Sequence, residues 1–237
     1  ITGPDLTAKF EEHMRKYGID LKEGEEAVDI KRSGDIIKVK TRKAEYQSKT
    51  VIIASGKVSK ELGVPGEKEF KNKGLSYCAT CDAPIFTGKD VAVVGGGNSA
   101  LDAALQLMKI ARRVYIINIT QNLGGDAVMR EKVEAGSMVT ILNNTHITAV
   151  IGDKMISGIK LKKDGKEDLL SVQGVFVEIG LISNSKFAGD IDKNEYGERK
   201  INTRNETNVP GIFAAGDVTD VPEKQIVIAA GEGSKAA

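Results

Sequence analysis

The stretch VAVVGGGNSA, residues 91–100, determines the fold that we expect for this chain. Four apolar residues end directly on three glycines, and apolar residues at helical spacing continue to Ile110. The result is G-x-G-x-x-A between a strand and a helix, the context of a dinucleotide-binding fingerprint. Gly95 permits the tight turn, Gly97 lets the backbone approach a pyrophosphate, and Ala100 allows close packing of helix on strand. An ordinary βα turn is the alternative, and the flanking strand and helix favour the fingerprint.

Downstream of the fingerprint, strands and helices alternate, which is typical of a parallel sheet covered by helices. After the helix over 99–110 we expect a strand, a helix and a strand over 114–117, 127–135 and 139–142. Hairpin strands should follow over 147–151, 156–162 and 170–179, with a turn at Asp164-Gly165. This domain should close near Asn205.

The two ends of the chain predict a second unit. Leu6, Phe10 and Met14 recur every four residues, which predicts an amphipathic helix whose buried stripe packs on a sheet. Two strands of an antiparallel meander, over 27–30 and 36–41, should lead to a buried strand over 50–54. A further buried strand over 212–215 and a helix over 225–236 complete this unit. Two glycine-ended strands in separate regions therefore suggest two nucleotide-binding units.

Composition excludes several classes of protein. The chain has 237 residues with 34 Lys+Arg against 33 Asp+Glu, so it offers no basic surface for nucleic acid. Its apolar runs have strand length and fall short of the roughly 18 residues of a membrane span. Two cysteines cannot frame a secreted disulfide scaffold of this length. We therefore expect a soluble, cytoplasmic protein without nucleic-acid or membrane partners.

The cysteines form a single C-x-x-C, Cys78-Ala79-Thr80-Cys81, whose spacing allows a local redox disulfide. A structural zinc would need four ligands, but no second C-x-x-C exists and His13 and His146 lie far away in sequence. Inert packing is the other alternative. Asp82 follows directly, where its carboxyl could exchange a proton with a thiolate or serve only as a turn residue. We expect a redox pair and no metal.

The residue expected to bind the adenosine ribose is Asn118, at the end of the strand after the fingerprint helix. Asn can hydrogen-bond a ribose hydroxyl but supplies no charge. NADP sites usually place cationic side chains here, and none occurs before Arg130. NADH or NADPH is expected, with NADH favoured. We also assign Asn98 and Ser99, at the start of the fingerprint helix, to the nicotinamide dinucleotide.

Four segments resemble the thioredoxin reductase type of flavoprotein disulfide reductase: C-A-T-C-D, G-G-G-N-S-A, I-I-A-S-G and A-A-G-D-V. V-P-G-E at 64–67, K-Q-I at 224–226 and G-E-G at 231–233 resemble most closely the branch of flavoprotein subunits of alkyl hydroperoxide reductase. The motifs stand in order from Ile1 to Ala237. The resemblance is therefore specific for the family and less specific for the branch.

The resemblance implies an α/β fold with two Rossmann-like, three-layer ββα nucleotide-binding domains. The NAD(P) domain, over 59–206 and carrying the cysteine pair, would be inserted into an FAD domain formed by 1–58 and 207–237. The residues that match FAD contacts in this family are Ala54, Ser55, Gly56, Gly216, Asp217, Lys224, Gln225 and Ile226.

The implied activity is a flavin-dependent NAD(P)H:protein-disulfide oxidoreductase. Cys81 would face the flavin, Cys78 would attack the disulfide of a thioredoxin-like or peroxiredoxin-type protein, and Asp82 would act as acid and base. The inserted domain is expected to rotate about connections at 55–63 and 203–210, and a homodimer is expected. The alternative is a non-catalytic nucleotide-binding fragment that has lost flavin.

The chain also departs from the family pattern. The family carries a strand and G-x-G-x-x-G for the FAD pyrophosphate upstream of the region that matches Ile1, so we expect a partial chain that binds FAD less tightly. The stretch Leu181-Ile182-Ser183-Asn184 lacks the proline that the family often has before Asn.

Overall fold

The computed structural model describes residues 3–237, which divide into two compact units. Unit 2 is the continuous segment Lys57–Asn184, and unit 1 combines the residues up to Gly56 with Ser185–Ala237. The sequence predicted that the chain returns from the inserted domain to the first one between residues 206 and 207. In the structure the chain returns from unit 2 to unit 1 between Asn184 and Ser185. The buried side chain of Arg199 accounts for this difference, because it donates hydrogen bonds to the carbonyls of Ser185 and Ile191.

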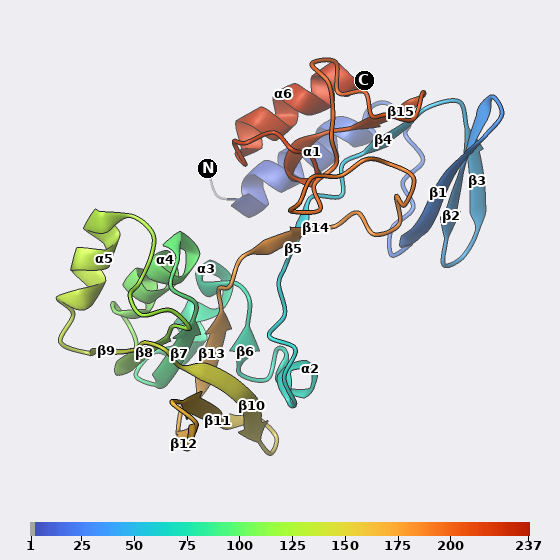
Figure 1. The fold of residues 1–237 in the computed structure, drawn as a ribbon. Helices are drawn as coiled ribbons and strands as arrows, with labels where there is room; N and C mark the ends of the chain where they lie inside the picture. The colour runs from blue at the N-terminus through green and yellow to red at the C-terminus, as the bar shows by residue number, and fades with distance from the viewer. Residues whose placement is uncertain (1–2) are drawn as a thin grey trace. The chain divides into compact units, whose positions relative to one another are not determined.

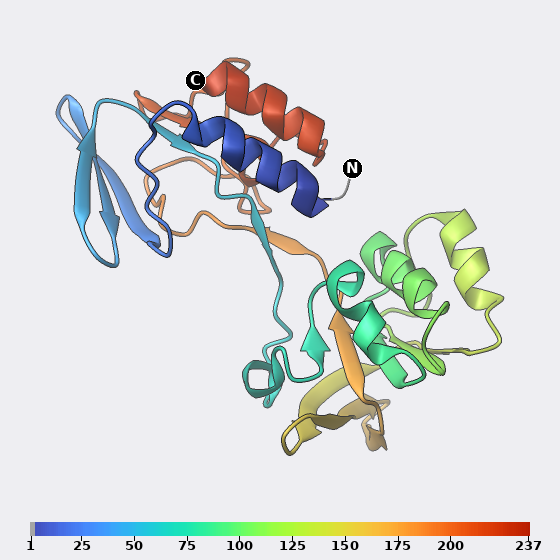
Figure 2. The same ribbon diagram turned by 180° about the vertical axis from the view of Figure 1, so that it is seen from behind.

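Unit 2 is built on a five-stranded parallel sheet (Figures 1 and 2). Its strands, in spatial order, are β6 (Leu75–Ser76), β13 (Gly174–Val177), β7 (Asp90–Val94), β8 (Arg113–Ile117) and β9 (Val139–Leu142). Helices α4 (Asn98–Leu107) and α5 (Ala127–Glu134) cover one face. The antiparallel sheet of β10 (His146–Gly152), β11 (Ile156–Lys163) and β12 (Lys166–Leu170) covers the other. Unit 2 therefore has the predicted three layers.

The sequence of β7 explains why it occupies the centre of this sheet. Val91 and Val93 pack into the core shared with α4, and Ala92 and Val94 pack into the core on the opposite face. Every residue of the strand is buried. A continuous apolar run is what a strand covered on both faces requires, since its side chains alternate between the two faces.

The remaining elements of unit 2 precede or close the sheet. β5 (Lys57–Ser59) pairs antiparallel with β14 (Leu181–Ser183), and α2 (Glu67–Phe70) follows β5. The disulfide segment, residues 78–86, comprises Cys78, α3 (Ala79–Asp82) and the 3-10 turn η1 (Ala83–Phe86). The predicted single strand over 170–179 is wrong: the chain leaves β12 at Leu170 and enters β13 only at Gly174.

Unit 1 contains an antiparallel meander and a parallel strand pair. The meander consists of β1 (Ala27–Ser33), β2 (Ile36–Thr41) and β3 (Glu45–Ser48). β4 (Val51–Ile53) pairs in parallel with β15 (Ile212–Ala214), and η2 (Gly216–Val218) and α6 (Ile226–Ala236) follow. Ile30, Ile37, Ile53 and Ile212 are among the residues of its core. The strand β3 was not predicted, because its four exposed residues carry no apolar alternation.

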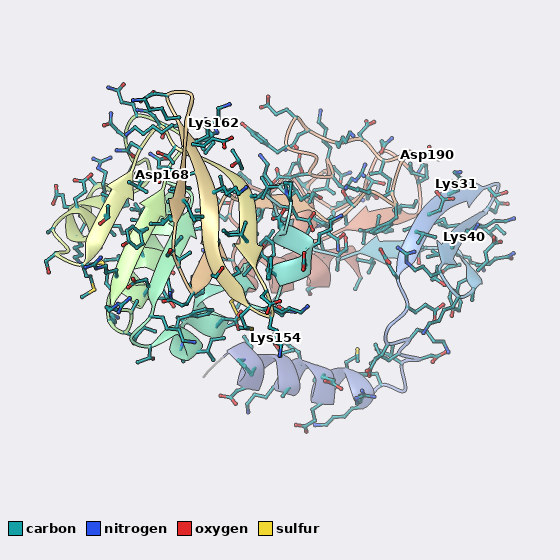
Figure 3. All side chains as sticks on the ribbon, turned by 90° about the horizontal axis from the view of Figure 1, so that it is seen from below. Lys31, Lys40, Lys154, Lys162, Asp168 and Asp190 are labelled. Carbon is teal, nitrogen blue, oxygen red and sulfur yellow. A yellow bond between two sulfur atoms is a disulfide. The ribbon has the colours of Figure 1, made fainter. Side chains whose placement is uncertain are left out.

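Helix α1 (Gly3–Arg15) forms as predicted, but its apolar stripe is not buried. Phe10 is 53% exposed, and Leu6 and Met14 are only partly covered. Figure 3 shows the helix standing apart from the strands of unit 1. The expectation of a buried stripe was wrong because amphipathic spacing is a local property, whereas burial requires a packing partner.

In residues 3–237, no helix is long and apolar enough to cross a membrane.

Candidate functional site

Cys78 and Cys81 form a disulfide, with their Cα atoms 5.3 Å apart. Cys78 is the N-cap of α3, and its Sγ accepts the backbone N–H of Cys81 at 3.2 Å. Cys81 is exposed and Cys78 is half-buried. The bond is therefore reachable from solvent, so the alternative of inert packing is not supported. Among residues 3–237, no three His, Cys, Asp or Glu side chains meet in a way that could hold a metal.

Asp82, the last residue of α3, is anchored by Ser76, the last residue of β6. The Ser76 hydroxyl donates to Asp82 Oδ2 at 2.6 Å and accepts the backbone N–H of Cys78 at 3.0 Å. Ser76 is only 4% exposed. The carboxyl that the sequence suggested as a proton carrier thus belongs to one hydrogen-bonded group with the backbone of the disulfide.

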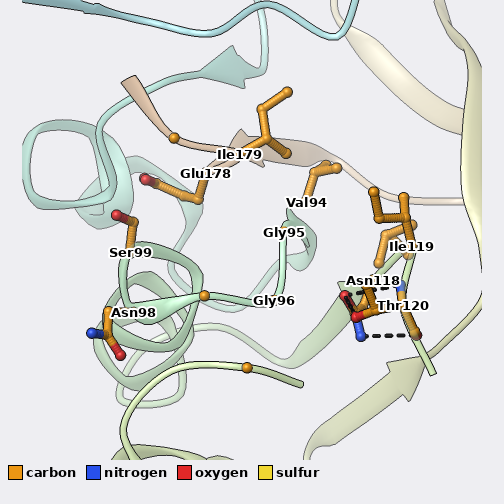
Figure 4. Close-up of a pocket in the computed structure, with 14 residues that line it drawn as sticks. Val94, Gly95, Gly96, Asn98, Ser99, Asn118, Ile119, Thr120, Glu178 and Ile179 are labelled. Atoms are coloured by element: carbon orange, nitrogen blue, oxygen red, sulfur yellow. Dashed lines mark hydrogen bonds between the residues drawn. The ribbon is translucent and has the colours of Figure 1, made fainter. Parts of the chain in front are cut away.

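A cavity of about 490 Å³ opens at the carboxyl ends of β7, β8 and β13 (Figure 4). Ligands of open parallel sheets bind at this edge, where the connections from neighbouring strands leave toward opposite faces. The cavity is lined by Val94, Gly95, Gly96, Gly97, Asn98, Ser99, Ile117, Asn118, Ile119, Thr120, Gly124, Glu178, Ile179 and Gly180. The structure therefore brings the fingerprint glycines and Asn118 to one cavity.

The three fingerprint glycines differ in why a side chain is absent at their positions. A Cβ at Gly95, where φ is +132°, would lie 2.3 Å from the carbonyl oxygen of Glu178. A Cβ at Gly96 would lie 2.4 Å from Asn118 Oδ1. A Cβ at Gly97 would meet no protein atom within 4 Å. Gly95 and Gly96 are thus required by packing, whereas Gly97 leaves open space at the start of α4, where N–H groups can receive a pyrophosphate.

Asn118 holds the loop after β8. It is 2% exposed, and its Nδ2, which carries two hydrogens, lies within 3.1 Å of three acceptors: the carbonyls of Thr120 and Asn122 and Asn143 Oδ1. Its amide donor is therefore engaged within the protein, and the exposed lining residues at this end of the cavity are Ile119 and Thr120. Asn98 has a comparable role, since its Oδ1 accepts the backbone N–H of Asp126 at 2.7 Å.

Glu178, which was not predicted from the sequence, follows β13 and lines the cavity. Its carboxylate accepts the backbone N–H of Ala79, the residue after Cys78. Burial raises the pKa of Glu178 from its ordinary value near 4.5 to about 7, and the negative charge of Asp102 adds to this effect. A carboxyl of the dinucleotide cavity thus touches the disulfide segment. No sequence signal joins it to Ala79, because 99 residues separate the two positions along the chain.

A second carboxylate, Glu67, fixes the chain between β5 and α2. It is 2% exposed and accepts the backbone N–H groups of Leu62 and Gly63 at 2.6 and 2.7 Å, together with the Tyr77 hydroxyl at 2.7 Å. Burial and this hydrogen bond raise the pKa of Tyr77. Since Tyr77 precedes Cys78, Glu67 links the predicted connection over 55–63 to the disulfide segment.

Unit 1 holds a second cavity of about 380 Å³, within the range of roughly 300 to 1,000 Å³ common for ligand sites. It is lined by Ile52, Ala54, Gly56, Ala215, Gly216, Asp217, Lys224, Gln225, Ile226, Ala229 and Gly233. Seven of the eight positions matched to FAD contacts therefore meet here, and Ser55 lies between two of them. A Cβ at Gly56 or Gly233 would meet no protein atom within 4 Å. The glycines leave space for a ligand, so these residues fit a flavin dinucleotide.

Lys224 is fixed before helix α6. Its Nζ donates to the carbonyl of Thr219 at 2.6 Å and lies 3.1 Å from a carboxylate oxygen of Glu198. Gln225 and Ile226, which follow it, are exposed. The lysine therefore places the beginning of α6 against the cavity, and the next two side chains are available to a ligand.

Unit 2 thus combines a dinucleotide-type cavity with a solvent-accessible disulfide between nearby cysteines. These two features together are typical of a nucleotide-linked disulfide oxidoreductase. The family model described as pyridine nucleotide-disulphide oxidoreductase matches residues 4–233. The chain belongs to this family.

Similar proteins agree with this assignment. The chain is 42% identical over 240 residues to a subunit of Staphylococcus aureus alkyl hydroperoxide reductase, covering 100% of this chain and 47% of that protein. It is 40% identical over 239 residues to a protein named NADH dehydrogenase of Ferdinandcohnia aciditolerans, covering 99% and 46%. The chain therefore spans about half the length of these curated relatives.

Solved structures show the same fold. The crystal structure of T. acidophilum thioredoxin reductase matches with a TM-score of 0.81 at 36% identity, covering 100% of this chain and 79% of that one. Lactococcus lactis thioredoxin reductase matches with a TM-score of 0.84 at 31% identity and the same coverage. The resemblance inferred from the motifs is confirmed.

Proposed function

We propose that this chain carries the nicotinamide-binding, disulfide-bearing unit and part of the flavin-binding unit of a flavin-dependent NAD(P)H:protein-disulfide oxidoreductase. One observation carries the proposal: Glu178 lines the dinucleotide cavity and accepts a hydrogen bond from Ala79, so the cavity and the Cys78–Cys81 disulfide are adjacent in unit 2. The names of the similar proteins, a subunit of alkyl hydroperoxide reductase and two thioredoxin reductases, support a peroxiredoxin-type or thioredoxin-like partner.

Two cofactors are proposed. The fingerprint glycines and Ser99 would bind the nicotinamide dinucleotide, and the lining of the unit 1 cavity would bind FAD. When bound, FAD supplies a two-electron carrier between a nicotinamide and a disulfide. NADH is favoured because no Lys or Arg lines the unit 2 cavity, and the name of one relative contains NADH.

The protein's own residues would perform the exchange with the partner. After reduction, the Cys78 thiolate attacks one sulfur of the partner disulfide, forming a mixed disulfide and releasing the other partner sulfur as a thiolate. The Cys81 thiolate then attacks Cys78, which restores the Cys78–Cys81 bond and releases the second partner thiolate. The partner gains two electrons, and Asp82 exchanges protons with the leaving thiolates. A homodimer and rotation of unit 2 remain proposals from the resemblance.

An anaerobic titration of the whole protein with NADH tests this function. NADH should bleach the flavin absorbance and reduce a peroxiredoxin or thioredoxin disulfide. Cys78→Ser should abolish partner reduction while leaving the bleaching intact, and Thr80→Ser, between the two cysteines, serves as the matched control. Normal partner reduction in Cys78→Ser would reject the role of the cysteines. A colourless whole protein that binds NADH and reduces nothing after FAD is added would favour a non-catalytic nucleotide-binding module.

A further inference from the structure

The Ser76 hydroxyl has more than one hydrogen-bond partner within reach. It donates to Asp82 Oδ2 at 2.6 Å, and the carbonyl oxygen of Cys78 is a second acceptor at 3.3 Å. It also accepts the backbone N–H of Cys78 at 3.0 Å. A hydroxyl has one hydrogen to donate and two lone pairs to accept with. Ser76 can therefore bond Asp82 either as donor or as acceptor without losing the Cys78 N–H.

The two arrangements correspond to the two protonation states of Asp82. An ionised carboxylate only accepts, so Ser76 donates to it across the 2.6 Å between Ser76 Oγ and Asp82 Oδ2. A protonated carboxyl can donate its O–H to Ser76 Oγ, and the hydroxyl hydrogen then turns to the Cys78 carbonyl. Both states keep the carboxyl beside the same oxygen atom. A proton carrier must stay in place whether or not it holds the proton, because its geometry decides the transfer.

The location of Ser76 makes it a firm anchor. It ends β6, which pairs with β13 at the edge of the parallel sheet, and its side chain is almost fully buried. Asp82, in contrast, ends a helix of four residues that cannot hold a carboxyl rigidly alone. The sheet therefore supplies the fixed point and α3 supplies the carboxyl.

We propose that Ser76 is a positioning residue that keeps the Asp82 carboxyl beside the Cys78–Cys81 pair in both protonation states by reversing the direction of their hydrogen bond. The inference rests on the proton-carrying role proposed above for Asp82. It goes beyond that role by assigning the residue that makes one carboxyl serve both as acid and as base.

Reduction of the disulfide by dithiothreitol isolates this step, since it requires neither a nucleotide nor a flavin. A dithiothreitol thiolate attacks one protein sulfur, the Cys78–Cys81 bond breaks, and a mixed disulfide forms. The leaving cysteine thiolate takes the proton from Asp82, which is replenished from water. The second dithiothreitol sulfur displaces the mixed disulfide, so dithiothreitol loses two electrons and the protein ends with two thiols.

The experiment measures this rate by quenching with N-ethylmaleimide and mass spectrometry on four variants. Ser76→Ala should slow reduction about tenfold, part of the roughly 10² to 10⁴ that a positioned acid contributes. Ser76→Thr, which retains the hydroxyl, should stay within about threefold of wild type on the same scale. Asp82→Asn should be at least as slow as Ser76→Ala. The double variant should match Asp82→Asn alone, because the serine then has no proton carrier to position.

Thr87→Ala is the matched control, because its hydroxyl also bonds a carbonyl of the disulfide segment, that of Pro84 at 2.9 Å, but no carboxylate. It should react at the wild-type rate. Urea unfolding verifies that each variant is folded, and Ser76→Gly replaces Ser76→Ala if that variant is not.

Two results would overturn the proposal: a wild-type rate in Ser76→Ala, or a tenfold slowing by Ser76→Ala that persists in the Asp82→Asn background. Because dithiothreitol replaces the cofactors, these results do not depend on whether the proposed electron donor and partner are correct.

Discussion

Each unit contains a strand with a parallel neighbour that is followed by a glycine turn at the edge of a cavity: β7 in unit 2 and β15 in unit 1. The surroundings of these two strands differ. β7 is the central strand of five and is buried throughout. β15 pairs in its sheet with β4, whose Ile52 is 43% exposed. The same local signature thus occurs once inside a closely packed three-layer unit and once in a more open one. The glycine turn is a local property, and its tolerance to change depends on what packs around it.

The largest effect is expected at Gly95. Gly95→Ala combines an unfavourable φ of +132° with a Cβ 2.3 Å from a carbonyl oxygen, so it should lower the free energy of unfolding by about 3 kcal/mol or more. Denaturant unfolding measures this loss. Gly97→Ala is the control, since its Cβ meets no protein atom: it should keep stability and weaken dinucleotide binding. Equal stabilities of the two variants would contradict the packing argument.

Gly216, which follows β15 in unit 1 as Gly95 follows β7 in unit 2, should tolerate substitution by alanine better than Gly95. At Gly216, φ is +75° and an added Cβ would lie 3.3 Å from the Ala229 Cβ, a contact that a small shift relieves. Gly216→Ala should therefore cost about 1 to 2 kcal/mol, mainly from the backbone conformation. The measurement is again denaturant unfolding. A loss as large as that of Gly95→Ala would show that the two surroundings are equally rigid.

The two cavities also differ in charge, because Lys224 lines the cavity of unit 1 whereas no basic residue lines that of unit 2. Ile119→Arg would add a cation at the predicted ribose end of the unit 2 cavity. It should tighten NADPH binding about tenfold relative to NADH, or about 1.4 kcal/mol. Fluorescence titration with both nucleotides measures the ratio. Ile119→Gln is the uncharged control, and an equal gain there would contradict an electrostatic cause.

The smallest effect concerns Glu178. Because burial raises its pKa from near 4.5 to about 7, its neutral form is favoured in the folded chain. Its contribution to stability is complete below about pH 4.5 and is lost as the pH rises through about 7. Glu178→Gln should therefore reduce the loss of stability between pH 5.5 and 8, which urea unfolding at both values compares. An unchanged pH dependence would show that Glu178 is not the titrating group.

Most of unit 2 could be predicted from the sequence, since its strands and helices have distinct apolar periods. The strands at Val91 and Val114, the helix after Gly97 and the turn at Asp164-Gly165 all lie where the sequence predicted them. The two-residue strand β6 could not be predicted, because so short a segment has no period. Burial of α1 was predicted and is absent, because spacing shows an apolar stripe but not its partner.

By itself, the sequence determined the glycine turn after β7 and the disulfide between Cys78 and Cys81. Both depend on residue types at fixed short spacing, so the local backbone is sufficient to specify them. Only the tertiary structure decided that Ser76 anchors Asp82 and that Glu178 joins the dinucleotide cavity to Ala79. For Glu178 the physical reason is the pairing of β13 between β6 and β7, which brings Glu178 to Ala79 although the two residues are 99 positions apart in the chain. Ser76 and Asp82 are only six positions apart, but their hydrogen bond depends on where β6 and α3 lie in the folded unit.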